Sequence, residues 1–268
     1  MTTHVKPTHS GPPTAELYFE VRGSGAPVLL IAGTPGDGGQ FDELADVLAR
    51  DHLVVTYDRV GTSRSPAPPA WTDTTVADQA DDAARLLRKL VTEPATVYGT
   101  SNGAAVALEV ALRHPTLVSR AILHEMPLLA VLADPGPVGA MLGDVIGSAM
   151  AAGGPRAALD AFLRFAYGDA IVDAWPSDLR ARLLANADMA FAIELPAFQA
   201  YRPDEAALAA HHPSFDVAVG VDQQAPFFLE AAGWLANGSH SPIIRTPGAH
   251  GPHFSDPEAL AAMLFPGG

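Results

Sequence analysis

Apolar and polar positions along the chain form two alternating kinds of segment. Short apolar runs of strand length are separated by longer segments whose apolar residues recur with helical spacing. The strand-like runs lie at 15–23, 27–33, 52–58, 95–99, 118–125, 215–220 and 241–246. The first run alternates and predicts an edge strand, whereas the second is continuously apolar and predicts a strand that helices cover on both faces. The pattern predicts an α/β fold with a mostly parallel, doubly wound sheet.

Helical spacing is found between most of these strand-like runs. The segments that show it are 40–50, 76–90, 104–115, 227–236 and 256–265. In the segment 76–90 the acidic residues come early and the basic residues come late, which matches the dipole of a helix. We therefore expect this segment to form an amphipathic helix beside the sheet.

The alternation of strands and helices stops after residue 125 and returns near residue 214. Between them the chain contains only helix-like or irregular segments, at 136–153, 156–168, 176–198 and 204–212. This insertion leaves the core at the carboxyl end of a strand, where open α/β sheets bind ligands. We therefore predict a core formed by 1–125 and 214–268 and an inserted helical lid or cap formed by 126–213. A subdomain core without a role in binding is the alternative.

The composition narrows the classes of partner. The 268 residues are enough for one large domain, and the formal net charge of −14 repels phosphate backbones, so we expect no nucleic-acid partner. No apolar run approaches about 18 residues, and the first residues lack the apolar centre of a signal peptide. The chain contains no cysteine, which excludes disulfides and thiolate metal sites. We expect a cytoplasmic protein with a small-molecule substrate and no membrane partner; the composition leaves its oligomeric state open.

The most informative short stretch is Gly99-Thr100-Ser101-Asn102-Gly103, which has the pattern G-x-S-x-G. By itself this pattern is weak, because glycine and serine are common in loops. Here a predicted strand ends at the first glycine and a predicted helix starts at the second, as a nucleophile elbow requires. Small flanking residues let a strained turn lift a serine hydroxyl toward a substrate, near the positive end of the helix dipole. We therefore interpret Ser101 as a nucleophile.

A serine hydroxyl needs a base to take its proton. Two histidines, His250 and His253, follow the last predicted strand. The glycine-alanine turn before His250 allows its ring to reach over the strand ends, so we expect His250 to be the base. We expect His253 to be a residue of the pocket wall or of the surface. The two could also be taken for a metal pair, but we find no third group of ligands and predict no metal.

These motifs occur together in a known family. The chain resembles the α/β-hydrolase fold superfamily from about residue 15 to its end, through the stretches IAGTPG, YDRVGTSRS, GTSNG and PGAHGPHFSDPEAL. In relatives a histidine lies seven residues before a proline that opens the last helix; His250 and Pro257 have this spacing and His253 does not. The resemblance implies Ser101 as nucleophile and His250 as general base of an esterase-like or lactonase-like serine hydrolase with a lid.

The resemblance leaves two candidates for the triad acid. Relatives place it either after the strand that follows the nucleophile helix, where this chain has Glu125, or after the penultimate strand, near Asp222. Many relatives show Gly-x-x-Asp at the second place, but in this chain that register leads to Gln223. We therefore prefer Glu125 and keep Asp222 as the alternative acid. Without a catalytic role, Glu125 would be an ion-paired anchor of the lid and Asp222 a turn or capping residue.

The oxyanion loop departs from the family pattern at one position. Relatives usually carry His-Gly at its start, and the imidazole braces the loop, whereas this chain has Ala32-Gly33. The resemblance implies the backbone N–H groups of Thr34 and Asn102 as the two oxyanion donors, one of which is typically worth about 3 kcal/mol. In the stretch YDRVGTSRS we expect the side chains of Asp58 and Arg59 to hold the loop beside the site.

These residues predict cleavage of an ester, lactone or thioester through an acyl-enzyme on Ser101, with His250 and a carboxylate assisting. The apolar insertion predicts a mainly apolar substrate, and the mechanism needs no cofactor or metal. Two alternatives stay open. Relatives with the same serine site cleave carbon–carbon bonds or perform cofactor-free eliminations and rearrangements. A non-catalytic small-molecule-binding protein is the alternative of another class, supported by Ala32 and the ambiguous acid. An aspartate-nucleophile enzyme is disfavoured, because residue 101 is a serine.

Overall fold

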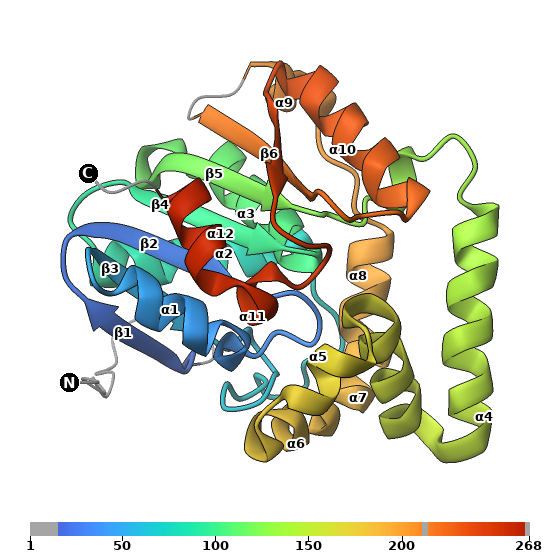
Figure 1. Cartoon of the computed structure of the whole chain (residues 1–268). Coiled ribbons are helices and arrows are strands. Elements are labelled where there is room, and N and C mark those ends of the chain that lie inside the picture. The colour runs from blue at the N-terminus through green and yellow to red at the C-terminus, as the bar shows by residue number, and fades with distance from the viewer. Residues whose placement is uncertain (1–15, 211–213, 266–268) are drawn as a thin grey trace.

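A seven-stranded sheet forms the centre of the molecule (Figure 1). The computed structural model describes residues 16–210 and 214–265. The strands are β1 (Phe19–Gly23), β2 (Ala26–Ile31), β3 (His52–Tyr57), β4 (Ala95–Thr100), β5 (Val118–His124), β6 (Ser214–Gly220) and β7 (Ile243–Thr246). They follow the order β1-β3-β2-β4-β5-β6-β7, in which β1 is antiparallel and every other neighbouring pair is parallel. The predicted fold class and the predicted edge strand are both confirmed.

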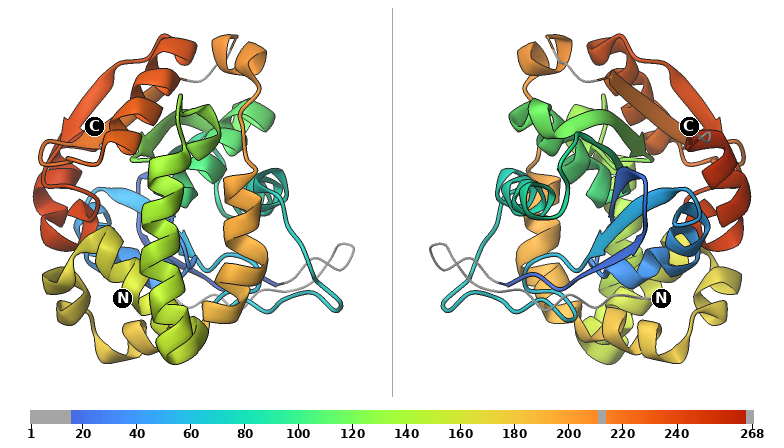
Figure 2. Two further views of the ribbon diagram at one scale, coloured as in Figure 1. Left: turned by 90° about the vertical axis from the view of Figure 1, so that its right-hand side faces the viewer. Right: turned by 90° about the vertical axis from the view of Figure 1, so that its left-hand side faces the viewer.

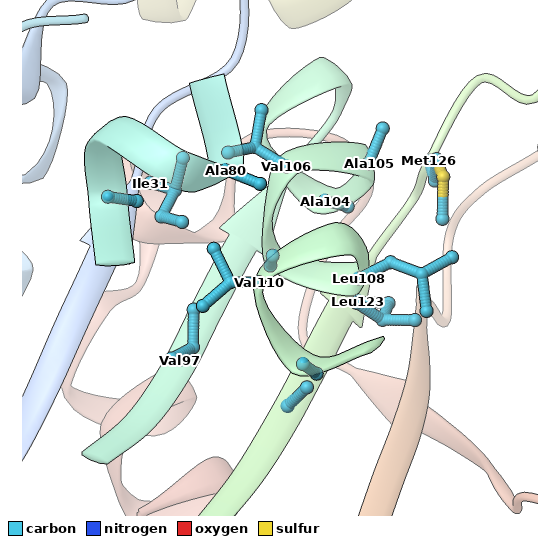
Figure 3. Close-up of a cluster of buried hydrophobic side chains, with 14 of the residues drawn as sticks. Ile31, Ala80, Val97, Ala104, Ala105, Val106, Leu108, Val110, Leu123 and Met126 are labelled. Atoms are coloured by element: carbon cyan, nitrogen blue, oxygen red, sulfur yellow. The ribbon is translucent and has the colours of Figure 1, made fainter. Parts of the chain in front are cut away.

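Helices cover both faces of this sheet, as the continuously apolar central strands require. Alternate residues of β2 point to opposite faces, so Leu29 and Ile31 pack in one core cluster and Val28 and Leu30 in another. One face is covered by α2 (Val76–Leu90), α3 (Asn102–Arg113) and α10 (Pro226–Ser239). The other face is covered by α1 (Asp42–Leu48) and α12 (Pro257–Leu264). Figure 3 shows side chains of α3 next to those of the neighbouring strands.

Helix α2 shows how local sequence sets an element's ends. It has the predicted bounds, and it begins with a capping box between Thr75 and Asp78. The N–H of Asp78 donates to the Thr75 hydroxyl at 3.0 Å, and the N–H of Thr75 donates to the Asp78 carboxylate at 3.0 Å. Two N–H groups that have no partner within the helix are thereby satisfied.

Between β5 and β6 the described residues, 125–210, form helices and the loops that join them. The elements are η3 (Leu129–Val131), α4 (Gly136–Tyr167), α5 (Asp169–Ala174), α6 (Ser177–Ala185), α7 (Ala187–Met189), the π-helical segment η4 (Ala190–Glu194), α8 (Leu195–Gln199) and α9 (Glu205–Ala209). The long helix α4 faces the viewer in the left view of Figure 2. It is kinked at Gly153 and Gly154, where the two predicted helices meet. The end of the predicted insertion, at residue 213, lies outside the described residues.

The predicted helical segment 176–198 is not continuous. It is interrupted at Asn186, whose side chain is used outside the helix: its amide oxygen accepts from the Ser63 N–H at 2.8 Å, and its amide nitrogen donates to the Ser63 hydroxyl at 2.9 Å. Several of these helices share a buried apolar cluster of their own, which includes Leu163, Trp175 and Leu183. Among the helices of 16–210 and 214–265, none is both long and apolar enough to cross a membrane.

Candidate active site

Ser101 lies in a tight turn between β4 and α3. Its φ of 54° and ψ of −132° are strained for a residue with a side chain. The two flanking glycines are required by close approach: a Cβ at Gly99 would lie 2.3 Å from the Gly103 carbonyl oxygen, and one at Gly103 would lie 2.2 Å from the Ile31 carbonyl oxygen. Strand, turn and helix therefore form the arrangement that the G-x-S-x-G pattern predicts.

His250 and Glu125 come together from two strand ends. His250 lies in the loop after β7, and its Nδ1 is 2.8 Å from Oε2 of Glu125, the residue directly after β5. Both side chains are buried, and Glu125 has a strained φ of 45°. The His250 ring stacks on the ring of Phe228, with centroids 4.8 Å apart. The imidazole is therefore fixed on one side by a carboxylate and on another by an aromatic face.

The Glu125 carboxylate is held in its charged form. Its Oε1 accepts from the Gly220 N–H at 2.9 Å, and its Oε2 accepts from the side-chain amide of Gln223 at 2.7 Å as well as facing His250. Burial by itself raises the pKa of Glu125. The hydrogen bond to His250, the nearby imidazoles of His124 and His250 and the Gly220 N–H outweigh burial and lower the pKa of Glu125 to about 2. Because Glu125 is ionised at neutral pH, Nδ1 of His250 carries the proton between them.

Asp222, the alternative acid, is placed differently. It lies in the exposed turn after β6, where its N–H donates to the Gly248 carbonyl oxygen at 2.9 Å. Its carboxylate has no hydrogen bond to another residue in the described part of the chain. The next residue, Gln223, contacts Glu125 through its side-chain amide. Sequence reasoning noted this glutamine as a mismatch and missed its contact with the other candidate acid.

The loop after β2 lies against Ser101. A Cβ at Gly33 would be 2.9 Å from the Ser101 Cβ, so the loop backbone passes directly beside the serine. The Asn102 side-chain amide donates to the Thr34 hydroxyl at 2.8 Å, which joins this loop to the start of α3. Within 16–210 and 214–265, neither the N–H of Thr34 nor that of Asn102 has a hydrogen-bond acceptor. Both donors are therefore free for a ligand atom.

Ser101 and His250 line one cavity of about 410 Å³. Its walls come from the loops at the strand ends and from the helical insertion, and they are mainly apolar and aromatic. They include Leu129, Leu142, Phe162, Phe165, Tyr167, Leu195, Phe198, Phe227 and Phe228. The polar side chains that line the cavity are mainly amides, together with the carboxylate of Asp222. No lysine or arginine of the described residues lines it. The cavity therefore suits an apolar ligand without negative charge.

Two further histidines are buried near this site. His124, the residue before Glu125, is within hydrogen-bond distance of the hydroxyls of Thr100 (3.1 Å) and Thr246 (3.2 Å), and it links the strand ends that carry Ser101 and His250. Burial lowers the pKa of His124 to about 4. In the sequence, His124 is a titratable residue near the end of the apolar run 118–125, a position that favours a buried polar contact.

The prediction for His253 is wrong. The side chain belongs neither to the surface nor to the cavity wall: it is fully buried against the rings of Phe41, Tyr167 and Phe254. Neither ring nitrogen has a hydrogen-bond partner among the described residues, and burial lowers the pKa of His253 well below its usual value. The apolar contacts of the short helix α11 (Pro252–Ser255) turn the ring inward, which sequence spacing does not show.

Replacement of His253 by Phe should change how stability depends on pH. The folded protein keeps His253 neutral, whereas the unfolded chain takes up a proton near the usual histidine pKa of about 6.5. Stability is therefore lost as pH falls below about 6.5, by at most about 1.4 kcal/mol per pH unit for each such proton. Urea unfolding at pH 7, 6 and 5 should show a smaller loss for His253→Phe than for the wild type. Parallel losses in the two proteins would contradict this assignment.

The described residues contain no group of three or more His, Asp or Glu side chains that could hold a metal ion. The catalytic candidates at the site are a serine, an imidazole, a carboxylate and backbone donors. Such a set can form and break an acyl-enzyme.

Comparison with known proteins agrees with the fold. Residues 26–161 match the family described as alpha/beta hydrolase fold. The chain is 43% identical over 120 residues to an uncharacterized hydrolase, YraK, of Bacillus subtilis, and this match covers 45% of the chain and 44% of the relative. The chain therefore matches less than half the length of this curated relative.

Two solved structures are similar over most of their length. An esterase from Thermogutta terrifontis aligns with a TM-score of 0.71 and 22% identity, covering 96% of this chain and 93% of the other. The enol-lactonase from Burkholderia xenovorans aligns with a TM-score of 0.72 and 18% identity, covering 90% and 92%. At this identity the likeness establishes a shared fold.

Proposed function

The chain belongs to the α/β-hydrolase fold family, and from this premise we propose that it is a serine hydrolase that cleaves an ester, lactone or thioester of a mainly apolar small molecule. The observation that supports this most is the Glu125–His250 pair, 2.8 Å apart, beside the cavity that Ser101 also lines. The strained serine turn and the two free N–H groups beside it fit the same reaction.

In the proposed reaction Ser101 attacks the acyl carbon while Nε2 of His250 takes its proton. Glu125 orients the ring and stabilises the imidazolium that forms, because its carboxylate is buried and ionised. The N–H groups of Thr34 and Asn102 stabilise the oxyanion. His250 then protonates the leaving group, and water repeats the sequence on the acyl-enzyme.

The walls of the cavity support a neutral substrate. A carboxylate bound there would lose its hydration and meet Asp222 rather than a cation of the cavity wall. The names of the similar structures, an esterase and an enol-lactonase, support the ester or lactone class over an amide. Within this proposal the described residues of 126–213 form the lid, because Leu195 and Phe198 of α8 and several residues of α4 form walls of the cavity. The described residues of 1–125 and 214–268 form the core.

The substrate class is tested with two p-nitrophenyl esters of equal chain length. The hexanoate should give a burst of p-nitrophenol followed by turnover, whereas the adipate monoester, which ends in a carboxylate, should show a kcat/KM lower by on the order of 100-fold. The desolvation of an unpaired charge is the reason for the difference. Equal values for the two esters would contradict the neutral-substrate assignment.

The same assay separates the proposal from its rival on the same fold. Absence of a burst with esters of every chain length would favour a carbon–carbon hydrolase or an elimination enzyme. A wild-type protein that also fails to react with a fluorophosphonate would be a binding protein.

A further inference from the structure

The loop 32–36, which follows β2 and contains the Thr34 N–H, begins at Ala32. The side chain of Ala32 has no polar group that could brace this loop. In this chain Nη1 of Arg59 donates a hydrogen bond to the Ala32 carbonyl oxygen from the loop after β3. The backbone N–H of Arg59 also donates to the Gly36 carbonyl oxygen at 2.9 Å. One residue thus holds both ends of the segment 32–36.

Arg59 is itself held by the helical insertion. Its Nε and Nη2 both donate to Oε1 of Glu194, the first at 3.1 Å. Both residues are 1% exposed, so this is an ion pair out of contact with water. The other carboxylate oxygen of Glu194 has no partner among the described residues. Since the guanidinium is the sole hydrogen-bond donor to this buried carboxylate within the described chain, the pair acts as one unit.

Glu194 ends the π-helical segment η4, and two residues of the cavity wall come after it in α8. Leu195 follows it, and the ring of Phe198 lies 5.4 Å from the Arg59 guanidinium carbon. Local π-helical turns are often found at functional sites, because they turn one side chain out of its regular helical direction. Here the π-helical turn ends with Glu194 itself, whose carboxylate accepts from the Arg59 guanidinium.

We propose that Arg59 is a positioning residue: held by Glu194, it fixes the Ala32–Gly36 loop so that the Thr34 N–H points at the oxyanion. This inference rests on the proposed hydrolase reaction. Oxyanion donors are effective because they are already in place when charge develops, so a loosened loop slows the chemical step more than it weakens binding. A planar fork is needed, because the same group must reach a carbonyl oxygen and a carboxylate in different directions.

The test uses two variants of the full chain. Arg59→Met/Glu194→Met removes both charges together, which buried ion pairs often tolerate, whereas removal of one partner leaves an unpaired buried charge. Arg59→Lys keeps the charge and loses the fork. In both, kcat for p-nitrophenyl hexanoate should fall by roughly 10- to 100-fold with KM within about threefold of the wild type. The circular dichroism spectrum should be unchanged.

A second readout reports on the oxyanion itself. The thiono counterpart of the same ester places sulfur, a weaker hydrogen-bond acceptor, in the oxyanion position. The ratio of ester to thionoester rates should therefore fall in both variants, which a general loss of stability would not cause. Arg182→Met is the matched control: it removes another link between the insertion and this region, the 3.0 Å bond to Asp37, and should lower Tm with the ratio unchanged.

The outcomes are distinct. A folded Arg59→Lys or double variant with kcat and the rate ratio of the wild type would overturn the positioning role. An equal fall of the ratio in Arg182→Met would overturn it too, because loosening of the insertion would then be the cause. If the double variant does not fold, Arg59→Lys decides. Failure of the wild type itself to react at Ser101 would instead contradict the proposed function.

Discussion

Replacement of Ser101 by Ala is expected to reduce kcat for p-nitrophenyl hexanoate by on the order of 10⁶, because no other group could form the acyl-enzyme. The substitution removes one oxygen atom and keeps the Cβ that already lies at the strained turn with φ of 54°. The fold should therefore be retained, with an unchanged circular dichroism spectrum. Mass spectrometry of the wild-type protein after reaction with a fluorophosphonate should find the adduct on the peptide that contains Ser101.

The control for this prediction is a second buried serine. The hydroxyl of Ser239 donates to the Leu235 carbonyl oxygen within α10, and the residue does not line the cavity. Ser239→Ala should label and turn over like the wild type. If Ser101→Ala kept more than about a hundredth of the activity, or if the adduct lay on another residue, the acyl-enzyme mechanism would have to be abandoned.

Replacement of Glu125 by Gln is expected to reduce kcat by roughly 10³- to 10⁴-fold. The two oxygens of Glu125 accept from three donors: the Gly220 N–H, the Gln223 amide and Nδ1 of His250. An amide has a single oxygen, so its NH₂ group must face one of these donors. Where it faces Nδ1, the imidazole takes the tautomer with the proton on Nε2, which cannot accept the proton of Ser101.

The same carboxylate-to-amide replacement at Asp222 shows which of Glu125 and Asp222 is the triad acid. Asp222→Asn should reduce kcat by less than about tenfold, since that carboxylate is exposed and lacks a contact with His250 in the described residues. Steady-state kinetics of both variants, with fluorophosphonate labelling rates as a second measure, provide the comparison. A larger loss in Asp222→Asn than in Glu125→Gln would assign the acid to the loop after β6.

Much of the fold and part of the candidate site could be predicted from local patterns. A strand covered on both faces must be continuously apolar, and an amphipathic helix must repeat its apolar residues every three to four positions. The sequence alone therefore predicts β2 and α2. The serine turn was also recognisable, because its backbone leaves no room for a Cβ at Gly99 or Gly103 and only glycine meets that requirement. These constraints act within a few residues, so the residue types at those positions are enough to predict the local structure.

The remaining parts depend on contacts between distant segments. Glu125 and Asp222 both follow the ends of neighbouring parallel strands, so the sequence predicts that either could reach His250. The tertiary structure favours Glu125, through its backbone with φ of 45° and the hydrogen bonds from Gly220 and Gln223. His253 was misplaced for the same kind of reason, since aromatic packing rather than spacing turns its ring inward.

The pairing of Arg59 with Glu194 joins residues 135 positions apart and leaves no periodic trace in either segment. Steric and hydropathic requirements that act within one element can therefore be predicted from the sequence. The partner of a buried polar group cannot, because it depends on which segments the folded chain brings together.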